Sequence, residues 1–176
     1  MTTPASTVTV TRRRLLGAGL GLAASAPVWA EEPAAPLVVY AVRHAEKGTG
    51  DDPPLTEAGT ARAERLAAAL RDVPVQAVVS TATRRTRSTA EPAAKGHQLE
   101  VTTYAPKAGV LAKTLAGLSG AVLVVGHSNT IPALLRELGA ELALEELEGN
   151  DDLFLLVRAP GSAVSRPLLQ RLHYGG

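Results

Sequence analysis

Two uninterrupted apolar runs constrain the fold of this chain more than any other feature. They are 37–42, Leu-Val-Val-Tyr-Ala-Val, and 121–125, Ala-Val-Leu-Val-Val. A strand with apolar side chains on both faces has to be covered on both faces, which is typical of a parallel sheet between two layers of helices. Shorter segments at 77–79, 153–157 and 168–172 predict further strands.

Helical segments alternate with these strands. Thr56 is a suitable N-cap for a helix that continues to about Arg71, and the other expected helices are one that begins near Arg84, one over 107–118 and one over 131–138. A further strand is expected over 99–103, and the last two strands, joined by a turn at 159–162, are expected to pair antiparallel. The predicted fold class is therefore α/β, a three-layer sandwich whose mostly parallel sheet has helices on both faces and an antiparallel edge strand.

The N-terminus predicts an export signal. Three arginines at 12–14 precede an apolar run of 16 residues, 15–30, which ends in Val-Trp-Ala. The arginine pair resembles a bacterial twin-arginine signal. The run is shorter than the roughly 20 residues that span a bilayer, so cleavage after Ala30 is favoured over retention as an anchor. Residues 1–30 are thus expected to be a cleaved signal, and residues 31–176 a single domain located in the periplasm or outside the cell.

Composition removes several classes of function. The chain has 18 Lys and Arg against 17 Asp and Glu, which provides no broad basic field for nucleic acid. It contains no cysteine, so thiolate nucleophiles, iron–sulfur clusters and cysteine-based zinc sites are excluded. Among the four histidines, His97 and His173 have no Asp, Glu or His at metal-ligand spacing and are interpreted as structural or surface residues, so no metal site is expected.

Charged residues follow three of the predicted strands. Arg43 and His44 follow the first strand, 80–87 with Arg84, Arg85 and Arg87 follows the second, and Gly-His-Ser-Asn at 126–129 follows the long strand. In parallel sheets ligands bind at the carboxyl ends of the strands, so these groups are expected to converge. Arginines and histidines gathered in one place repel one another unless an anion joins them, and phosphate suits such a pocket.

At these segments the chain resembles the histidine phosphatase superfamily, also called phosphoglycerate mutase-like. The matching segments, in family order, are 42–47, 55–59, 79–91 and 124–129. The resemblance implies a phosphoglycerate mutase-like fold and a phosphohydrolase that needs neither a metal nor a cofactor. It implies that His44 is the nucleophile, which becomes a phosphohistidine, and that Arg43, Arg85, His127 and Ser128 bind the phosphoryl group. Arg84 and Arg87 leave the identity of the second arginine open by a residue or two.

The proton donor is where the chain departs from the family. Many members place a glutamate after the third strand, whereas this chain has Thr-Thr-Tyr-Ala-Pro at 102–106. Glu46, in the loop after the nucleophile, is the candidate acid, and Asp51 and Asp52 are the alternatives. If no acid is present, the substrate should carry a good leaving group, as a phosphoramidate does. The expected partner is a phosphorylated small molecule, glycan or protein.

Two other functions are compatible with the same residues. A chain that lacks the acid can be a phosphate-binding module with weak or no turnover. The sequence around Ser128 also approximates a nucleophile elbow, with Asp151 or Asp152 and His173 following in the order of a serine hydrolase. That interpretation leaves Arg43, His44 and Arg85 without a role.

Overall fold

A computed structural model describes residues 35–160 and 166–175. The predicted signal, residues 1–30, and with it the predicted cleavage and export, lies outside the described residues. Over these described ranges, no helix has the length and apolar character that crossing a membrane requires.

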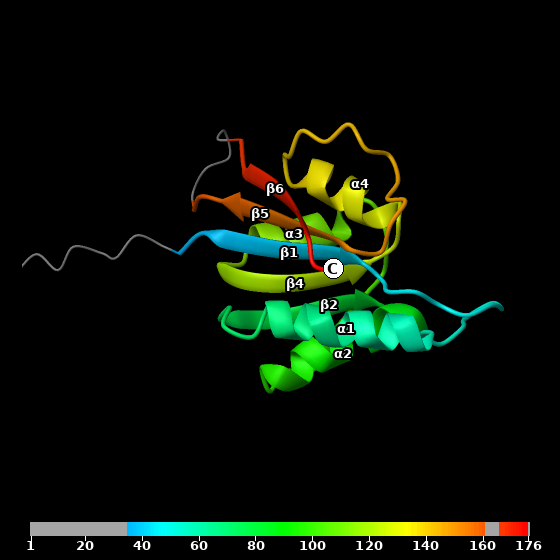
Figure 1. The fold of residues 1–176 in the computed structure, drawn as a ribbon. Helices are drawn as coiled ribbons and strands as arrows, with labels where there is room; N and C mark the ends of the chain where they lie inside the picture. Colours follow the sequence, from blue (N-terminus) through cyan, green and yellow to red (C-terminus); the bar gives the residue numbers. More distant parts are fainter. Residues whose placement is uncertain (1–34, 161–165, 176) are drawn as a thin grey trace, which may run out of the picture. The chain divides into compact units, whose positions relative to one another are not determined.

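The described chain forms a six-stranded sheet in the order β3-β2-β4-β1-β5-β6 (Figure 1). The strands are β1 (Leu37–Arg43), β2 (Val75–Thr81), β3 (Val101–Tyr104), β4 (Gly120–Gly126), β5 (Asp152–Arg158) and β6 (Leu168–His173). β1 pairs parallel with β4, and β2 pairs parallel with both β4 and β3. β5 pairs antiparallel with β1, and β6 pairs antiparallel with β5. The predicted fold class is confirmed, with the antiparallel pairing confined to the β1-β5-β6 side of the sheet.

The helices cover the sheet on both faces. They are α1 (Glu57–Ala69), α2 (Arg84–Gly96), α3 (Val110–Ala116) and α4 (Thr130–Glu137). α1 and α2 pack on one face, over buried residues that include Val42 and Val125. α3 and α4 pack on the other face, over Val39 and Val124. Alternate residues of each central strand therefore enter different cores, which is why these strands are apolar throughout.

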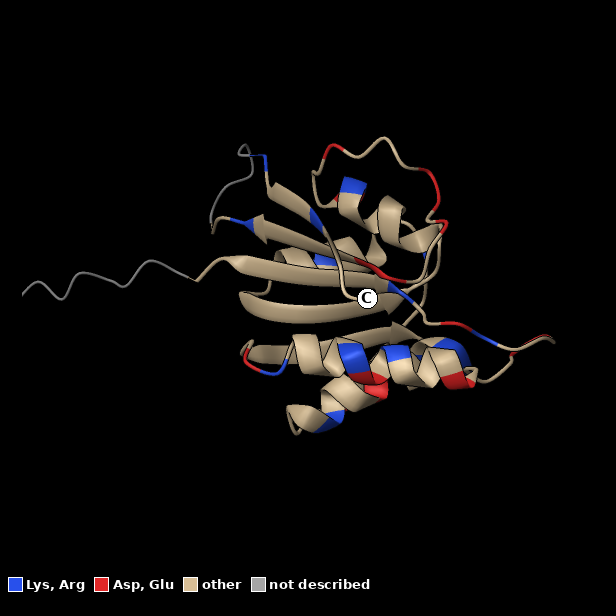
Figure 2. Cartoon of the chain, in the orientation of Figure 1, with Lys and Arg blue, Asp and Glu red and all other residues tan. Residues whose placement is uncertain are grey.

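Charge is distributed accordingly. Figure 2 shows basic and acidic residues on the outer surfaces of the helices and in the loops, while most of the central strand length carries none. In β1 to β5 the charged residues lie at strand ends, such as Arg43 at the end of β1, whereas the edge strand β6 carries Arg171 within its length. The carboxyl ends of the strands are therefore where polar chemistry can occur.

One helix begins later than the sequence predicts. The helix expected over 107–118 starts at Val110, because Gly109 before it adopts the left-handed conformation with φ of 71°. The backbone N–H of Lys107 donates to the carbonyl of Ala105 at 2.7 Å, residues 105–107 are irregular, and a turn at 108–109 leads into the helix.

The start of α1 fixes the loop that follows β1. Thr56 is the N-cap, as predicted, and its hydroxyl accepts the N–H of Gly59 at 3.1 Å. The N–H of Thr56 donates to the carbonyl of Glu46 at 3.0 Å. A Cβ on Gly59 would lie only 2.1 Å from that same carbonyl oxygen, so this position requires glycine for close approach.

We expect Gly59→Ala to lower the free energy of unfolding by about 3 kcal/mol, because the added methyl group forces α1 away from the backbone at Glu46. Urea denaturation would measure the change. Gly96→Ala is the matched control, because a Cβ at that helical glycine meets nothing within 4 Å. It should leave stability unchanged or raise it by about 0.5–1 kcal/mol. Equal losses in the two variants would contradict the close approach.

Candidate active site

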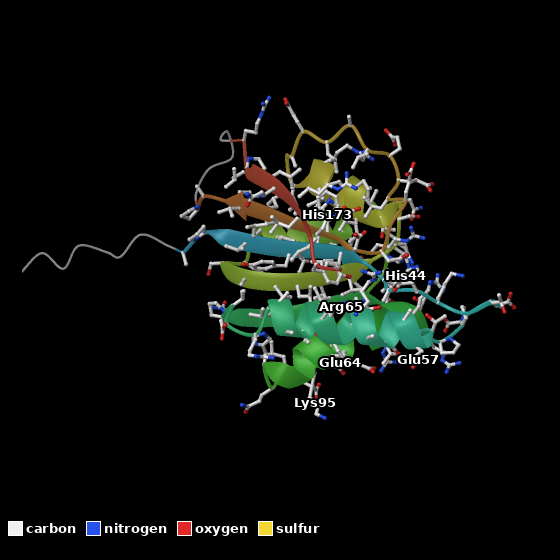
Figure 3. All side chains as sticks on the ribbon, in the orientation of Figure 1. His44, Glu57, Glu64, Arg65, Lys95 and His173 are labelled. Carbon is white, nitrogen blue, oxygen red and sulfur yellow. The ribbon has the colours of Figure 1, made fainter. Side chains whose placement is uncertain are left out.

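His44 lies directly after β1, at the carboxyl edge of the sheet (Figure 3). Its backbone N–H donates to the carbonyl of Gly126 at 2.9 Å, which ties the ends of β1 and β4 together. The residue is 5% exposed. Its Nδ1 lies 2.8 Å from the carbonyl oxygen of Ala45. Because a carbonyl oxygen only accepts, Nδ1 carries the proton of the neutral ring and Nε2 keeps a lone pair.

The surroundings of His44 favour this neutral form. Its pKa is lowered to about 4, first because burial removes water from the charged ring, and further because His127, Arg85 and Arg43 place positive charge nearby. The hydrogen bond to Ala45 acts in the opposite direction without cancelling these effects. At neutral pH the imidazole is therefore uncharged and can act as a nucleophile through Nε2.

The backbone around His44 is held from two sides. The side-chain amide of Asn150, just before β5, donates to the carbonyl of His44 at 2.7 Å. The N–H of Ala45 donates to the hydroxyl of Thr89 at 3.0 Å, and Thr89 in turn donates to the carbonyl of Arg85 at 2.8 Å. The position of the imidazole thus depends on α2 and on the segment that leads into β5.

Arg43 and Arg85 both present an unpaired donor. Nη1 of Arg43 donates to the carbonyls of Leu147, Glu148 and Gly149 at 2.8, 3.0 and 3.5 Å, which fixes its guanidinium. Within the described part of the chain, the Nε atoms of Arg43 and Arg85 are buried and have no hydrogen-bond partner. A buried donor without an acceptor costs about 1–3 kcal/mol, so a ligand that accepts from both would be favoured.

The three arginines of the second segment lie in different environments. Arg84 and Arg87 are exposed, whereas Arg85 is partly buried. Of the three, only Arg85 lowers the pKa values of His44 and His127. The phase of α2 therefore turns Arg85 toward the histidines, in keeping with the position that the motif predicts for the second arginine.

His127 follows β4 and faces His44. The two rings lie 5.5 Å apart, centroid to centroid, with an interplanar angle of 70°. The backbone N–H of His127 donates to the hydroxyl of Thr130 at 2.8 Å, and Nε2 lies 3.0 Å from the hydroxyl oxygen of Thr81. Burial, then Arg85 and Arg43, lower the pKa of His127. Two neutral histidines therefore lie next to each other, close enough to two arginines for the guanidinium charges to lower both pKa values.

Glu46 does not suit the role of proton donor that the sequence suggests. Its carboxylate accepts hydrogen bonds from Arg62 of α1, from Nε at 2.8 and 2.9 Å and from Nη2 at 2.5 Å. The bonds from Arg62 lower the pKa of Glu46, so its carboxyl group is ionised at neutral pH and has no proton to donate. Its interaction with Arg62 joins the loop after β1 to α1, which is a structural task.

Asp52 reaches the site, and Asp51 is exposed beside it. The carboxylate of Asp52 accepts the backbone N–H of Arg84 at 3.0 and 3.2 Å, and so caps α2 in place of Thr83, whose side chain makes no cap bond. One oxygen lies 3.6 Å from Nη1 of Arg85. Asp52 is thus an acceptor and a counter-charge to Arg85.

Ser128 is not assembled into a hydrolase triad in the described structure. Its carbonyl accepts the N–H of Leu147 at 3.0 Å, and no hydrogen bond joins its hydroxyl to a histidine among residues 35–160 and 166–175. His173, the histidine that such a triad would use, lies on β6, where its side chain is 62% exposed. Figure 3 labels it apart from His44.

The structure does give His173 acidic neighbours, which the sequence spacing does not reveal. Its Nδ1 lies 3.6 Å from a carboxylate oxygen of Asp151 and 3.4 Å from one of Asp152. The three groups are close enough to hold a cation. Both oxygens of Asp152 already accept hydrogen bonds from Arg171, at 2.5 and 2.8 Å, so the cluster is explained by an ion pair.

Several residues that build the site have no signal in the sequence that links them to it. Asn150 and the carbonyls of 147–149 lie more than a hundred positions from Arg43 and His44. Thr81 and Thr89 fall within the segment 79–91, and the signal in the sequence that points to them is a hydroxyl group close to the arginines. The arrangement as a whole offers buried cationic donors, which suit a tetrahedral anion, and each neutral histidine keeps one unprotonated ring nitrogen, of which Nε2 of His44 can act as a nucleophile.

Comparison with known proteins gives consistent results. Residues 39–105 match the family model of the histidine phosphatase superfamily, branch 1, a range that contains Arg43, His44 and Arg85. Comparison of the sequence with curated proteins finds no match. Among solved structures, a protein assigned as the phosphohistidine phosphatase SixA of Agrobacterium tumefaciens is 25% identical with a TM-score of 0.60, over 78% of this chain and 97% of that one.

Two further structures share the fold. A protein histidine phosphatase SixA complexed with tungstate has a TM-score of 0.65 at 16% identity, over 77% of this chain and 96% of that one. A mycobacterial glucosyl-3-phosphoglycerate phosphatase has a TM-score of 0.62 at 16% identity, over 80% and 99%. The family model over residues 39–105, the fold and the paired arginines and histidines at the strand ends agree, and together they support the assignment of the chain to the histidine phosphatase superfamily.

Proposed function

We propose that the chain is a phosphatase that cleaves a phosphomonoester or a phosphoramidate through a covalent phosphohistidine on His44. The observation that carries this proposal is the pair of buried, unpartnered Nε–H groups on Arg43 and Arg85, set around a neutral imidazole. Oxygens of one phosphoryl group can accept from both arginines. The tungstate complex of the SixA relative supports the proposal, because tungstate is also an oxyanion.

The reaction has two steps. Nε2 of His44 attacks phosphorus in line and forms a P–N bond, while the bond to the leaving group breaks and its electron pair departs with that group. Water then attacks phosphorus, the P–N bond breaks, and inorganic phosphate and neutral His44 are released. The fixed positive charges of Arg43 and Arg85 stabilise the phosphoryl oxygens in both steps.

The site favours substrates whose leaving group needs little help. Glu46 is ion-paired to Arg62, and Asp52 accepts the N–H of Arg84, so neither is free to give a proton. A positioned general acid is typically worth about 10²–10⁴-fold in rate. Phosphoramidates and aryl phosphates depend on such an acid less than alkyl phosphates do. We therefore propose phosphoramidates and aryl phosphates as the substrate class.

The test is a comparison of leaving groups at constant pH. We expect kcat/KM for p-nitrophenyl phosphate and for phosphohistidine to exceed that for an alkyl phosphate by about 10²-fold or more, the range that a missing acid explains. Equal values for aryl and alkyl esters would contradict the absence of an acid. Binding of phosphate without any turnover would instead favour a binding module, and fluorophosphonate labelling that is lost in Ser128→Ala would favour a serine hydrolase.

We expect Asp52→Asn to lower KM for an anionic substrate by about twofold to fivefold, because Arg85 loses a partly exposed counter-charge 3.6 Å away. Asparagine keeps an oxygen that can accept the N–H of Arg84, so the start of α2 is retained. Steady-state kinetics at low ionic strength would measure the change. Asp51→Asn is the control, since it removes the same charge from the neighbouring exposed residue. A rise in KM for Asp52→Asn would show that the carboxylate assists binding.

A further inference from the structure

Three threonines, of which Thr81 and Thr86 are buried, form a chain of hydroxyl groups that ends on His127. The hydroxyl oxygen of Thr86 lies 2.9 Å from those of both Thr81 and Thr83. It also lies 2.8 Å from the carbonyl oxygen of Thr81 and 3.0 Å from that of Thr83. The hydroxyl oxygen of Thr81 is in turn 3.0 Å from Nε2 of His127. Thr81 and Thr86 are 2% and 0% exposed, so water does not compete for these bonds.

Counting protons gives the chain a direction. Thr86 has one hydroxyl proton and two carbonyl oxygens within 3.0 Å, and carbonyl oxygens only accept. If its proton pointed elsewhere, lone pairs would face lone pairs in a buried site, so Thr86 donates to a carbonyl. Its oxygen then accepts the proton of Thr81. With that proton used, the oxygen of Thr81 accepts from His127, which places the proton of the neutral ring on Nε2.

The other ring nitrogen is left for the ligand. Within the described residues Nδ1 of His127 has no hydrogen-bond partner, and in this tautomer it holds a lone pair. A lone pair repels a phosphoryl oxygen unless a proton lies between them. We propose that Thr81 is a positioning residue that keeps the proton of neutral His127 on Nε2, so that Nδ1 takes up a second proton when a phosphoryl anion binds. This step rests on the proposed function.

The charges around His127 agree with this behaviour. Arg43 at the end of β1 and Arg85 on α2 lower its pKa, after burial, and His44 faces it across 5.5 Å. On the side of β3, the hydroxyl of Tyr104 lies near Gly126 and adds no charge, since a phenol is neutral at pH 7 and burial raises its pKa further, to about 12. A bound dianion offsets the two guanidinium charges, and the imidazolium then becomes favourable. The empty site therefore avoids a third positive charge, which arises only when the anion has entered.

The tautomer can be tested without turnover. Long-range ¹H–¹⁵N correlation spectra of the full chain, with the His127 signals assigned by their loss in His127→Gln, distinguish an Nε2–H ring from an Nδ1–H ring. We expect the wild type and Thr81→Ser, which keeps the hydroxyl, to show the Nε2–H tautomer at pH 7. Thr81→Val has nearly the same volume without the hydroxyl and should show a mixture or the Nδ1–H form. An Nδ1–H ring in the wild type, or no change in Thr81→Val, would overturn the proposal.

Inorganic sulfate then tests the proton uptake, because it remains a dianion between pH 6 and 8. In the wild type and Thr81→Ser, sulfate should convert His127 to the doubly protonated ring, and affinity should rise as the pH falls. In Thr81→Val an Nδ1–H ring can donate without a second proton, so the rise should be smaller. A pH-independent affinity in the wild type would overturn the proposal. A correct tautomer and proton uptake in a protein that hydrolyses nothing would count against the proposed function alone.

Discussion

His44→Ala is expected to reduce kcat/KM by at least about 10³-fold, and phosphorylation of the protein should disappear with it. The imidazole is the nucleophile that we propose, and it is neutral with Nε2 unprotonated, because its Nδ1 proton is held by the carbonyl of Ala45 and its pKa is lowered to about 4. No carboxylate or hydroxyl is poised to replace it in the described structure, since Glu46 is held by Arg62. The measurement combines steady-state kinetics with rapid-quench trapping of radiolabelled protein, whose label should be acid-labile and stable in base.

His173→Ala provides the matched control, because this histidine lies on β6 with a side chain that is 62% exposed. Its kcat/KM should stay within about twofold of the wild type. His44→Ala should still bind inorganic phosphate through Arg43 and Arg85, which separates loss of chemistry from loss of the pocket. A variant that retains a tenth of the activity, or a label that persists, would exclude His44 as the nucleophile.

Much of the fold can be predicted from the sequence because its strands and helices are specified by patterns a few residues long. The runs at 37–42 and 121–125 identify central strands because only a doubly covered strand is apolar on both faces. The start of α1 follows from Thr56, whose hydroxyl caps the helix three residues later. These signals act within a few residues, so they survive without knowledge of the tertiary structure. The sequence predicts the start of α3 at 107, whereas the helix begins at Val110, after Gly109 in the left-handed conformation.

The features of the site that the sequence does not predict all depend on contacts between residues that are distant in the chain. Glu46 lies two residues after His44 in sequence, but its partner Arg62 is on α1, sixteen positions later. Likewise, Arg43 donates to the backbone carbonyls of 147–149, and because every residue type has a carbonyl, the sequence does not reveal these bonds. The sequence alone does not decide which of Arg84, Arg85 and Arg87 belongs to the site, because this depends on which face of α2 is turned toward the histidines. Sequence order therefore predicts which strand ends meet, and tertiary packing decides what each charged group does there.

The second large effect concerns that arginine. We expect Arg85→Gln to lower kcat/KM by about 10²–10³-fold, the usual cost of removing one preorganised donor from developing charge. Arg85→Lys keeps the charge but loses the planar fork and its buried Nε–H, so most of the loss should remain. Thermal stability should be unchanged or higher in both variants, because each removes the unpaired buried Nε–H, and Arg85→Gln also removes a cation beside two histidines.

Arg87→Gln is the control for this experiment, since Arg87 lies two residues further along α2 and is exposed. Its kcat/KM should change by no more than about twofold. A full rescue by lysine would mean that charge alone matters at position 85 and that the unpaired Nε–H has no catalytic use. A larger loss in Arg87→Gln than in Arg85→Gln would move the second phosphate-binding arginine to position 87, and the inward-facing turn of α2 would then need another explanation.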